Sequence, residues 1–459
     1  MIVAATTVVL VVSVLLGLRY WGVLLAVATT TYQFSSVYGL SFGISVALNT
    51  LPVIYLLPRL LLRRRYGFTI VDFFLLVWIG GYFINFARSY SMDVPLEIFL
   101  RTLFFCGCYF MLGRLLVMDD DRGKRYLCEY APAVILLTLF FALIAQDTSQ
   151  QELASQIQFD MDAGMEELAG RLAVGEGNPV GYSAAVNTAA STAIGILCAA
   201  IFARGVLPLR VTALAAVASV LMCIVALEAG TRGLIVALFG IGALIYLLAA
   251  MRNRTLSNRI TICLLAGGIL IPAYFALPSL LTSLAEVVAD QFGGEYGNVL
   301  RQLALMLSDS EALLRDQSTA GRLEFWYVGW KLIQDSPLLG TPTDYLMQNR
   351  FWAHNFFLEQ WVAAGLLGLV GAIVFVGSTF RAALRLIDVE DSGIFVVAIC
   401  STAIFVSFLI QAQFSFSTFH GKMMFLAAGM IIGLDRALRR ERVPIGMRRA
   451  PLPGPVAAE

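Results

Sequence analysis

Long apolar runs that recur from one end of this chain to the other constrain its fold more than any other feature. A helix of about 20 apolar residues crosses about 30 Å of hydrocarbon, and most of the runs reach that length. Of the 459 residues, 59% are hydrophobic and only 14% are charged, which is more apolar surface than a soluble core could bury. We therefore expect an all-α, polytopic transmembrane helix bundle.

Residues 1–442 are expected to form a single transmembrane domain of about 12 to 13 spans. The first run lacks the basic region and the cleavage site of a signal peptide, so we count it as a span. Residues 443–459 are rich in proline and glycine and are expected to form a disordered cytoplasmic tail. The predicted spans are residues 2–18, 21–38, 40–61, 69–87, 96–116, 127–145, 183–203, 211–228, 233–250, 260–280, 356–379, 393–411 and 421–434.

The basic residues of the short connections fall mostly on one side of the predicted bundle. Cytoplasmic loops carry an excess of arginine and lysine, so this side is assigned to the cytoplasm, together with the C-terminus. The opposite side has only Arg88, Arg171, Arg232 and Lys422 in its shorter connections. The cytoplasmic group comprises Arg59, Arg63, Arg64, Arg65, Arg122, Lys124, Arg125, Arg204, Arg210, Arg252, Arg254, Arg259, Arg381, Arg385, Arg436, Arg439, Arg440, Arg442, Arg448 and Arg449.

Two connections on the outer side are too long and too polar to lie within the bilayer. Residues 146–182 are acidic, and apolar residues at a helical spacing within them predict an amphipathic helix near the interface. This loop is either a solvated cap over the bundle or an element that selects the substrate. Residues 281–355 form the longer loop, in which further amphipathic interfacial helices are expected.

Composition and motifs exclude several classes of function. The net charge of +1 and the lack of a basic arm exclude nucleic acid as a partner. The seven cysteines lie in or beside apolar runs and the chain has only two histidines, so we expect no metal site and no cofactor. The acidic run 119–121 is expected to be a solvated cytoplasmic loop, because no nucleotide-binding domain lies behind it. The sequence also lacks a P-loop and a dinucleotide-binding glycine motif.

His354, at the end of the longer loop, is the first candidate for chemistry. An imidazole gains and loses a proton near neutral pH, and this one directly precedes a predicted span at the edge of the bilayer. Asn355 can orient the imidazole or a substrate hydroxyl, and Trp352 offers a flat face that suits a sugar ring. The alternative is an interfacial histidine in the aromatic belt of an ordinary membrane protein.

Two arginines on the outer side can hold an anionic group. Arg322 opens the segment 322–334, in which apolar residues including Trp326 follow a helical spacing, so it is expected at the N-terminus of an interfacial helix. Arg232 lies in a connection so short that its guanidinium must lie at the outer membrane boundary, with Glu228 four residues before it. The alternatives are a snorkelling arginine that binds lipid headgroups and a purely structural ion pair.

Arginine, tryptophan, Pro-Leu-Leu-Gly and His-Asn elements follow one another in a fixed order over residues 215–375. The elements are Thr231-Arg232-Gly233, Gly321-Arg322, Trp326, Trp330, Asp335-Ser336-Pro337-Leu338-Leu339-Gly340, His354-Asn355-Phe356-Phe357-Leu358 and Gly365-Leu366-Leu367-Gly368. This series resembles the signature region of the O-antigen ligase and O-antigen polymerase family of membrane proteins. The whole chain resembles that family only in its many-helix outline.

The resemblance implies a metal-independent, inverting glycosyltransferase at the periplasmic face of the bacterial inner membrane, acting in O-antigen or exopolysaccharide synthesis. Its donor would be an undecaprenyl-diphosphate-linked glycan, and its acceptor a glycan or a lipid A–core molecule. The lipid bilayer and, for a polymerase, a chain-length regulator are the further partners considered. Arg232 and Arg322 would bind the donor diphosphate, and His354 would be the catalytic base that deprotonates the acceptor hydroxyl.

The sequence departs from the family pattern at two places. Thr341-Pro342 stands where a glycine often follows Pro-Leu-Leu-Gly, which is expected to alter the shape of the loop. Ala364 stands where an acidic residue often precedes the Gly-Leu of the following span. Glu359 is then the carboxylate that is left to support His354.

Two other classes of protein compete with the enzyme. A transporter or flippase for lipid-linked oligosaccharides would have charged residues deep inside several spans, whereas most charges here lie at span ends. A non-enzymatic scaffold of polysaccharide assembly would use the aromatic segment 322–334 only as an anchor. The enzyme is favoured because Arg232, Arg322 and His354 are all expected to face outward.

Overall fold

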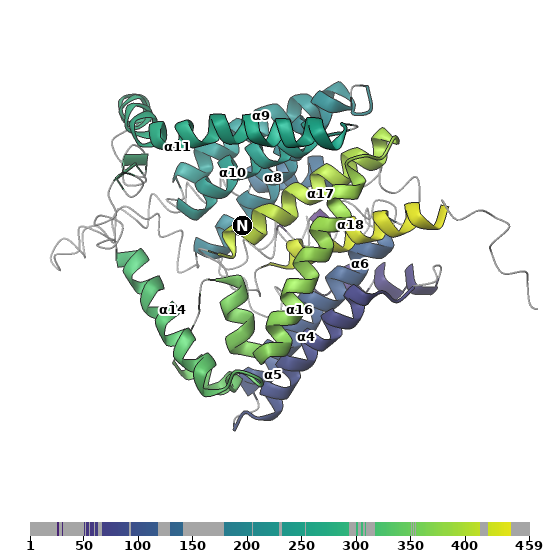
Figure 1. The fold of residues 1–459 in the computed structure, drawn as a ribbon, viewed down its shortest axis with the longest axis vertical. Coiled ribbons are helices and arrows are strands. Elements are labelled where there is room, and N and C mark those ends of the chain that lie inside the picture. The colour runs from purple at the N-terminus through teal and green to yellow at the C-terminus, as the bar shows by residue number, and fades with distance from the viewer. Residues whose placement is uncertain are drawn as a thin grey trace, which may run out of the picture.

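The structure is a computed structural model in which every regular element of the described residues is a helix (Figure 1). The described residues are 67–90, 93–117, 129–140, 179–203, 205–228, 232–252, 254–292, 317–349, 355–413 and 421–441, with Phe351, Ala353 and some residues between 25 and 62 and between 300 and 308. No strand occurs among them. The all-α prediction is therefore confirmed.

Within these ranges, five helices are long and apolar enough to cross a membrane. They are Ile70–Ala87, Ile98–Leu116, Ala184–Phe202, Phe356–Leu386 and Ser392–Gln411. Shorter apolar helices in the described part are Pro52–Leu62, Glu129–Phe140, Leu209–Cys223 and Gly240–Ala250. The chain is a multi-pass membrane protein. The larger number of spans predicted from the sequence stays a prediction, because most of residues 1–66 lie outside the described part.

Most predicted spans in the described part coincide with helices. The elements are α4 (Ile70–Ala87), α5 (Asp93–Thr102), η1 (Leu103–Cys108), α6 (Tyr109–Leu116), α8 (Pro179–Phe202), α9 (Leu209–Glu228), α10 (Arg232–Ala250), α11 (Leu256–Phe292), α14 (Gln317–Asp335), α15 (Thr343–Gln348), α16 (Phe356–Leu386), α17 (Ser392–Gln411) and α18 (Lys422–Glu441). One span differs in kind: residues 103–108 of the predicted span 96–116 form a π-helical turn. Helix α11 also runs past the predicted end of its span and into the longer loop.

Helix α4 begins where its sequence supplies a capping box. The Thr69 hydroxyl accepts a hydrogen bond from the Asp72 amide, and the Asp72 carboxylate accepts one from the Thr69 amide over 2.6 Å. This reciprocal pair satisfies amide groups that would otherwise have no partner at a helix start. The helix ends at Ala87, with Arg88 as its C-cap residue.

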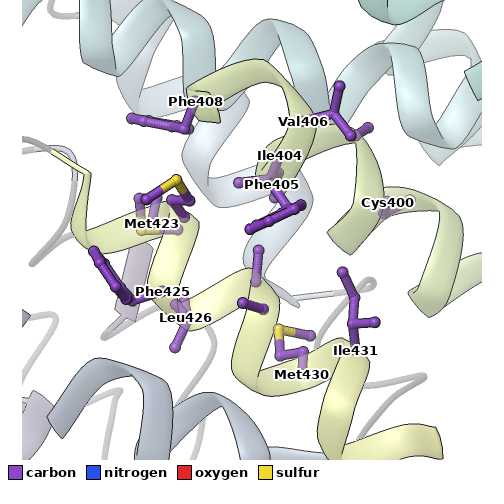
Figure 2. Packing of buried hydrophobic residues seen from close by; sticks show 14 of the residues in the cluster. Cys400, Ile404, Phe405, Val406, Phe408, Met423, Phe425, Leu426, Met430 and Ile431 are labelled. Carbon is purple, nitrogen blue, oxygen red and sulfur yellow. The ribbon is translucent and has the colours of Figure 1, made fainter. Parts of the chain in front are cut away.

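The helices pack through a few extensive pairings. Helix α16 packs mainly against α4, α18 against α6, and α17 against α8 and α18. Figure 2 shows where α17 and α18 pack together, with Phe405 and Phe408 on α17 and Met423 and Phe425 on α18; the Phe425 ring points away from α17. All four side chains are buried. In Figure 1, α14 stands apart from the bundle and touches it near the start of α16.

Small residues and one ion pair fix the crossing of α6 with its neighbours. A Cβ at Gly113 would overlap the Leu426 backbone oxygen, so the two helices approach as closely as backbones can. At the next residue, the guanidinium of Arg114 forms an ion pair with the Asp72 carboxylate of α4, and both side chains are buried. The same guanidinium donates a hydrogen bond to the Gly67 oxygen over 3.0 Å. The start of α4 and the end of α6 are thereby joined.

The opposite half of the bundle has a similar junction around Arg252. Its guanidinium donates to the Phe202 oxygen at the end of α8 over 3.1 Å and to the Val389 oxygen after α16 over 3.3 Å. The guanidinium also lies 4.1 Å from the centre of the Phe395 ring, which is a cation–π distance. The ends of α8, α10 and α16 therefore meet, and these are ends that the charge pattern assigns to one side of the membrane. Which side faces the cytoplasm stays a prediction.

Candidate functional site

The candidate site is built around the start of α16, the helix that directly follows His354. Asn355 is the N-cap residue: its backbone is extended, with φ −147°, and its side-chain oxygen accepts a hydrogen bond from the Leu358 amide over 3.0 Å. Asparagine is among the residues preferred at this position because its short side chain reaches the free amides of the first turn. The structure therefore uses the Asn355 side chain to start the helix. An orienting role toward a substrate hydroxyl stays a prediction.

The indole of Trp326 joins α14 to the backbone just before Asn355. Its Nε1–H donates a hydrogen bond to the Ala353 carbonyl oxygen over 2.8 Å, and Ala353 is fully buried. Beside this bond, the rings of Phe325, the residue before Trp326, and Phe351 meet edge to face at 5.8 Å. A polar bond and an aromatic contact thus attach α14 to the residues on either side of position 352.

Arg322 lies one helical turn before Trp326, so the two side chains leave the same face of α14. Its side chain is partly buried. The expectation that Arg322 opens this helix is wrong, because α14 begins at Gln317. The guanidinium therefore lies beyond the first turn, where the positive end of the helix dipole contributes little. Any anion held there is held by the guanidinium itself.

Glu359 is a buried carboxylate in the first turn of α16. It is 6% exposed, and it lies on the wall of a cavity of about 30 Å³ that Tyr82, Thr343 and Phe351 also line. A volume of this size holds about one water molecule. A carboxyl group that lines a small cavity therefore lies in the first helical turn after His354 in the sequence.

Helix α16 is broken at Gly365, and the Pro-Leu-Leu-Gly segment fills the break. Gly365 has φ 64° and ψ −159°, a conformation essentially restricted to glycine. The 336–342 loop supplies the missing partners: the Thr341 amide donates to the Val362 oxygen over 2.8 Å, and the Leu366 amide donates to the Leu338 oxygen over 3.1 Å. The two sequence motifs that surround His354 therefore interlock.

The two departures from the family pattern have a place in this interlock. Thr341 is buried and uses its amide for the bond to Val362, and Pro342 is the N-cap residue of α15. Ala364 is 1% exposed, and its oxygen lies where a Cβ at Gly81 would fall. Since a larger side chain has little room beside α4, the small residue at position 364 fits the close packing of these helices.

The remaining predicted site residues are placed only in part. Arg232 is the first residue of α10, and only its backbone is described. His354 and Trp352 lie outside the described residues, as do His420, the acidic run 119–121 and the loop residues 146–178. The structure joins Trp326 to Ala353, places Arg322 one turn before Trp326 on α14, and places Asn355 and Glu359 at the start of α16. The approach of Arg232 to this junction stays a prediction.

Three polar residues outside the sequence-predicted site hold this region against the bundle. Gln360 accepts hydrogen bonds from the Trp78 indole over 2.8 Å and from the Tyr82 hydroxyl over 2.7 Å. Asn85 and Arg88, at the end of α4, bond to the 336–342 loop. The sequence offered one signal for two of them: Asn85 and Gln360 are amides within predicted apolar spans, and an amide buried there is costly unless it is hydrogen-bonded.

Comparison with known protein families relates part of the chain to one family model. No curated protein matches the chain. The Wzy_C family model, described as O-Antigen ligase, matches residues 217–373, a range that contains Arg232, Arg322 and His354 and ends within α16 beyond the break. The protein is accordingly a multi-pass membrane protein in which residues 217–373 are similar to the O-Antigen ligase family model.

Proposed function

We propose that the protein is a membrane glycosyltransferase that transfers or polymerises an undecaprenyl-diphosphate-linked glycan at the outer face of the bacterial inner membrane. The observation that carries the proposal is the Trp326–Ala353 hydrogen bond. It attaches the helix that bears Arg322 to the residue that precedes His354. The helix that carries Arg322 is thereby linked to the residue directly before His354 in the sequence, and both residues lie in the matched region.

The proposed reaction needs three events at the anomeric carbon of the donor. His354 accepts the proton of the acceptor hydroxyl, and the acceptor oxygen forms a bond to the anomeric carbon. The bond between that carbon and the diphosphate oxygen breaks, and the electron pair leaves with the diphosphate. Arg322 and Arg232 stabilise the negative charge that grows on this leaving group. Attack from the face opposite the leaving group inverts the configuration.

Glu359 and Asn355 support this arrangement. Asn355 fixes the start of α16, so the direction in which the chain enters from residue 354 is set by its cap. Glu359 is buried in the first turn of α16 and is the carboxyl group that would stabilise the protonated imidazole formed during the reaction. The acceptor is then either a second lipid-linked glycan or a lipid A–core molecule, and a chain-length regulator is a partner only in the first case.

The test uses purified protein in lipid nanodiscs with undecaprenyl-diphosphate-linked repeat units. We expect wild-type protein to form glycosidic product, and His354→Ala to leave the donor unconsumed while it still inserts and folds. His420→Ala is the matched control, because it removes the other histidine of the chain. Normal product from His354→Ala would show that this residue is not the base. Movement of donor between leaflets without bond formation by the wild-type protein would indicate a flippase.

The same nanodisc assay distinguishes the two acceptors. Donor alone should be extended by a polymerase, because the second lipid-linked glycan is its acceptor. A ligase should leave donor alone unchanged and should form product only after lipid A–core is added.

A further inference from the structure

We propose that Asn85 of α4 is a positioning residue that holds the first segment of α16, residues 356–364, at the angle the reaction needs. This inference rests on the proposed function, and it concerns a residue outside the matched domain. Three kinds of observation carry it: the broken helix, the bonds made by the Asn85 amide, and the position of the segment directly after His354.

The break at Gly365 leaves the first segment of α16 dependent on other parts of the chain. A continuous helix fixes the direction of each turn by its own hydrogen bonds, whereas here three groups near the break bond outside the helix. Val362 and Leu366 bond to the 336–342 loop, and the Ala363 oxygen accepts from the Asn85 side chain over 2.8 Å. Since no water solvates backbone groups in the interior of a membrane bundle, these partners are required for the break to persist.

Asn85 lies between the two interlocked segments. Its Nδ2 donates to the Ala363 oxygen and also to the Leu339 oxygen over 2.6 Å, so one amide joins α16 to the loop. Its Oδ1 accepts from the Arg88 guanidinium over 2.9 Å, and the same Nη1 donates to the Gly340 oxygen over 2.9 Å. The side chain is fully buried and uses both its donors and its acceptor.

The amide chemistry of Asn85 is specific. Leucine has a similar size but offers no donor, so both carbonyl oxygens would lose their partner. Aspartate would place a carboxylate oxygen against the same two carbonyl oxygens, which repel it. The bond from Arg88 determines which end of the amide faces the carbonyls, because a guanidinium can only donate. Arg88 itself is exposed, so its replacement disturbs the packing little.

The effect of Asn85 on the candidate site follows from the order of the residues along the chain. Asn355 and Glu359 belong to the start of the first segment, and His354 directly precedes it. A small rotation of this segment about the break would change the relation between these residues and α14, which carries Arg322. Misplacement of a reacting group by about 1 Å costs about 100-fold in rate. Asn85 therefore acts on the reaction through the segment it holds, without contact to the substrate.

The experiment compares Asn85→Leu and Arg88→Met with Asn187→Leu in nanodiscs. Asn187 is the matched control, because it is also a fully buried asparagine and lies on α8, away from the junction. We measure kcat, the KM for the lipid-linked donor, and hydrogen exchange of segments 336–342 and 356–366. Positioning predicts a fall in kcat of about 10-fold to 100-fold for Asn85→Leu, a KM change below about 3-fold, and faster exchange in both segments.

Arg88→Met should give the same pattern with a smaller fall in kcat, about 3-fold, and keeps the test decisive if Asn85→Leu does not fold. Asn187→Leu should change neither kcat nor exchange at the two segments. Faster exchange with normal kcat would overturn the proposal, since Asn85 would then be only structural. A fall in kcat without faster exchange would overturn it as well. If the wild-type protein forms no glycosidic bond, the proposed function fails, and hydrogen exchange alone then decides whether Asn85 joins the two segments.

Discussion

The indole nitrogen of Trp326 lies 2.8 Å from the carbonyl oxygen of Ala353 and donates a hydrogen bond to it. The bond connects residues that are 27 positions apart. Helix α14 stands outside the main bundle, so contacts of this kind determine where its arginine lies (Figure 1). The position of Arg322 relative to α16 thus depends on the Trp326 side chain as well as on the helix that carries both residues.

Replacement of Trp326 by phenylalanine tests this dependence. The variant keeps an aromatic ring and loses the N–H, so the buried Ala353 oxygen loses its donor. We expect kcat to fall about 10-fold, because the two linked segments gain freedom. Trp330→Phe is the matched control: Trp330 is half-exposed on the same helix and contacts Trp361 only edge to face at 6.0 Å. Equal activity of the two variants would contradict the role assigned to the indole bond.

Gln360 is predicted to stabilise the contact of α4 with α16. Gln360→Leu removes the acceptor of both the Trp78 indole and the Tyr82 hydroxyl in a buried region, which should cost about 2–5 kcal/mol of unfolding free energy. Tyr82→Phe removes one donor and leaves the bond from Trp78, so its cost should be about 1 kcal/mol. Thermal unfolding in detergent measures both. If Tyr82→Phe is as unstable as Gln360→Leu, the shared acceptor role of the Gln360 amide does not explain the loss of stability.

Much of the fold could be predicted because the apolar runs form helices and the polar residues that flank them lie at the helix ends. The run 69–87 became α4 within one residue, since Thr69 and Asp72 cap its start and the chain turns at Arg88. Helices α11 and α14 extend beyond their predicted bounds. Residues such as glutamine, serine and alanine are compatible with both helix and loop, so composition alone does not mark where these helices end.

The candidate site could be predicted in its motifs but not in its architecture. The order of Arg322, Pro-Leu-Leu-Gly and His-Asn pointed to one region, whereas nothing in the spacing predicted that the 336–342 loop enters a break in α16. Gly365 lies inside an apolar run, and helical periodicity carries no information on a single positive φ angle. Asn85 is far from the motifs in sequence, so only the fold reveals its bond to the Leu339 oxygen.

The buried pair of Asp72 and Arg114 is predicted to matter mainly when one partner is lost. Asp72→Leu leaves a buried guanidinium without its carboxylate and should destabilise the protein by about 3–5 kcal/mol. The double variant Asp72→Leu with Arg114→Met removes both charges and should recover part of that loss. Thermal unfolding of the two single variants and the double variant gives the coupling energy. Additive effects would show that the ion pair does not couple α4 to α6.

Gly365→Ala is predicted to be the most damaging of the small substitutions in α16. Alanine strongly disfavours φ 64° with ψ −159°, and its Cβ would overlap the Leu338 oxygen that receives the Leu366 bond. We expect a loss of at least about 3 kcal/mol of unfolding free energy and loss of glycan transfer. Gly377→Ala is the matched control, because Gly377 lies in the same helix with no other group within 4 Å of its added Cβ. That variant should keep wild-type activity and gain up to about 1 kcal/mol, since alanine favours a helix more than glycine does. A stable and active Gly365→Ala protein would mean that α16 runs unbroken and that the 336–342 loop lies elsewhere.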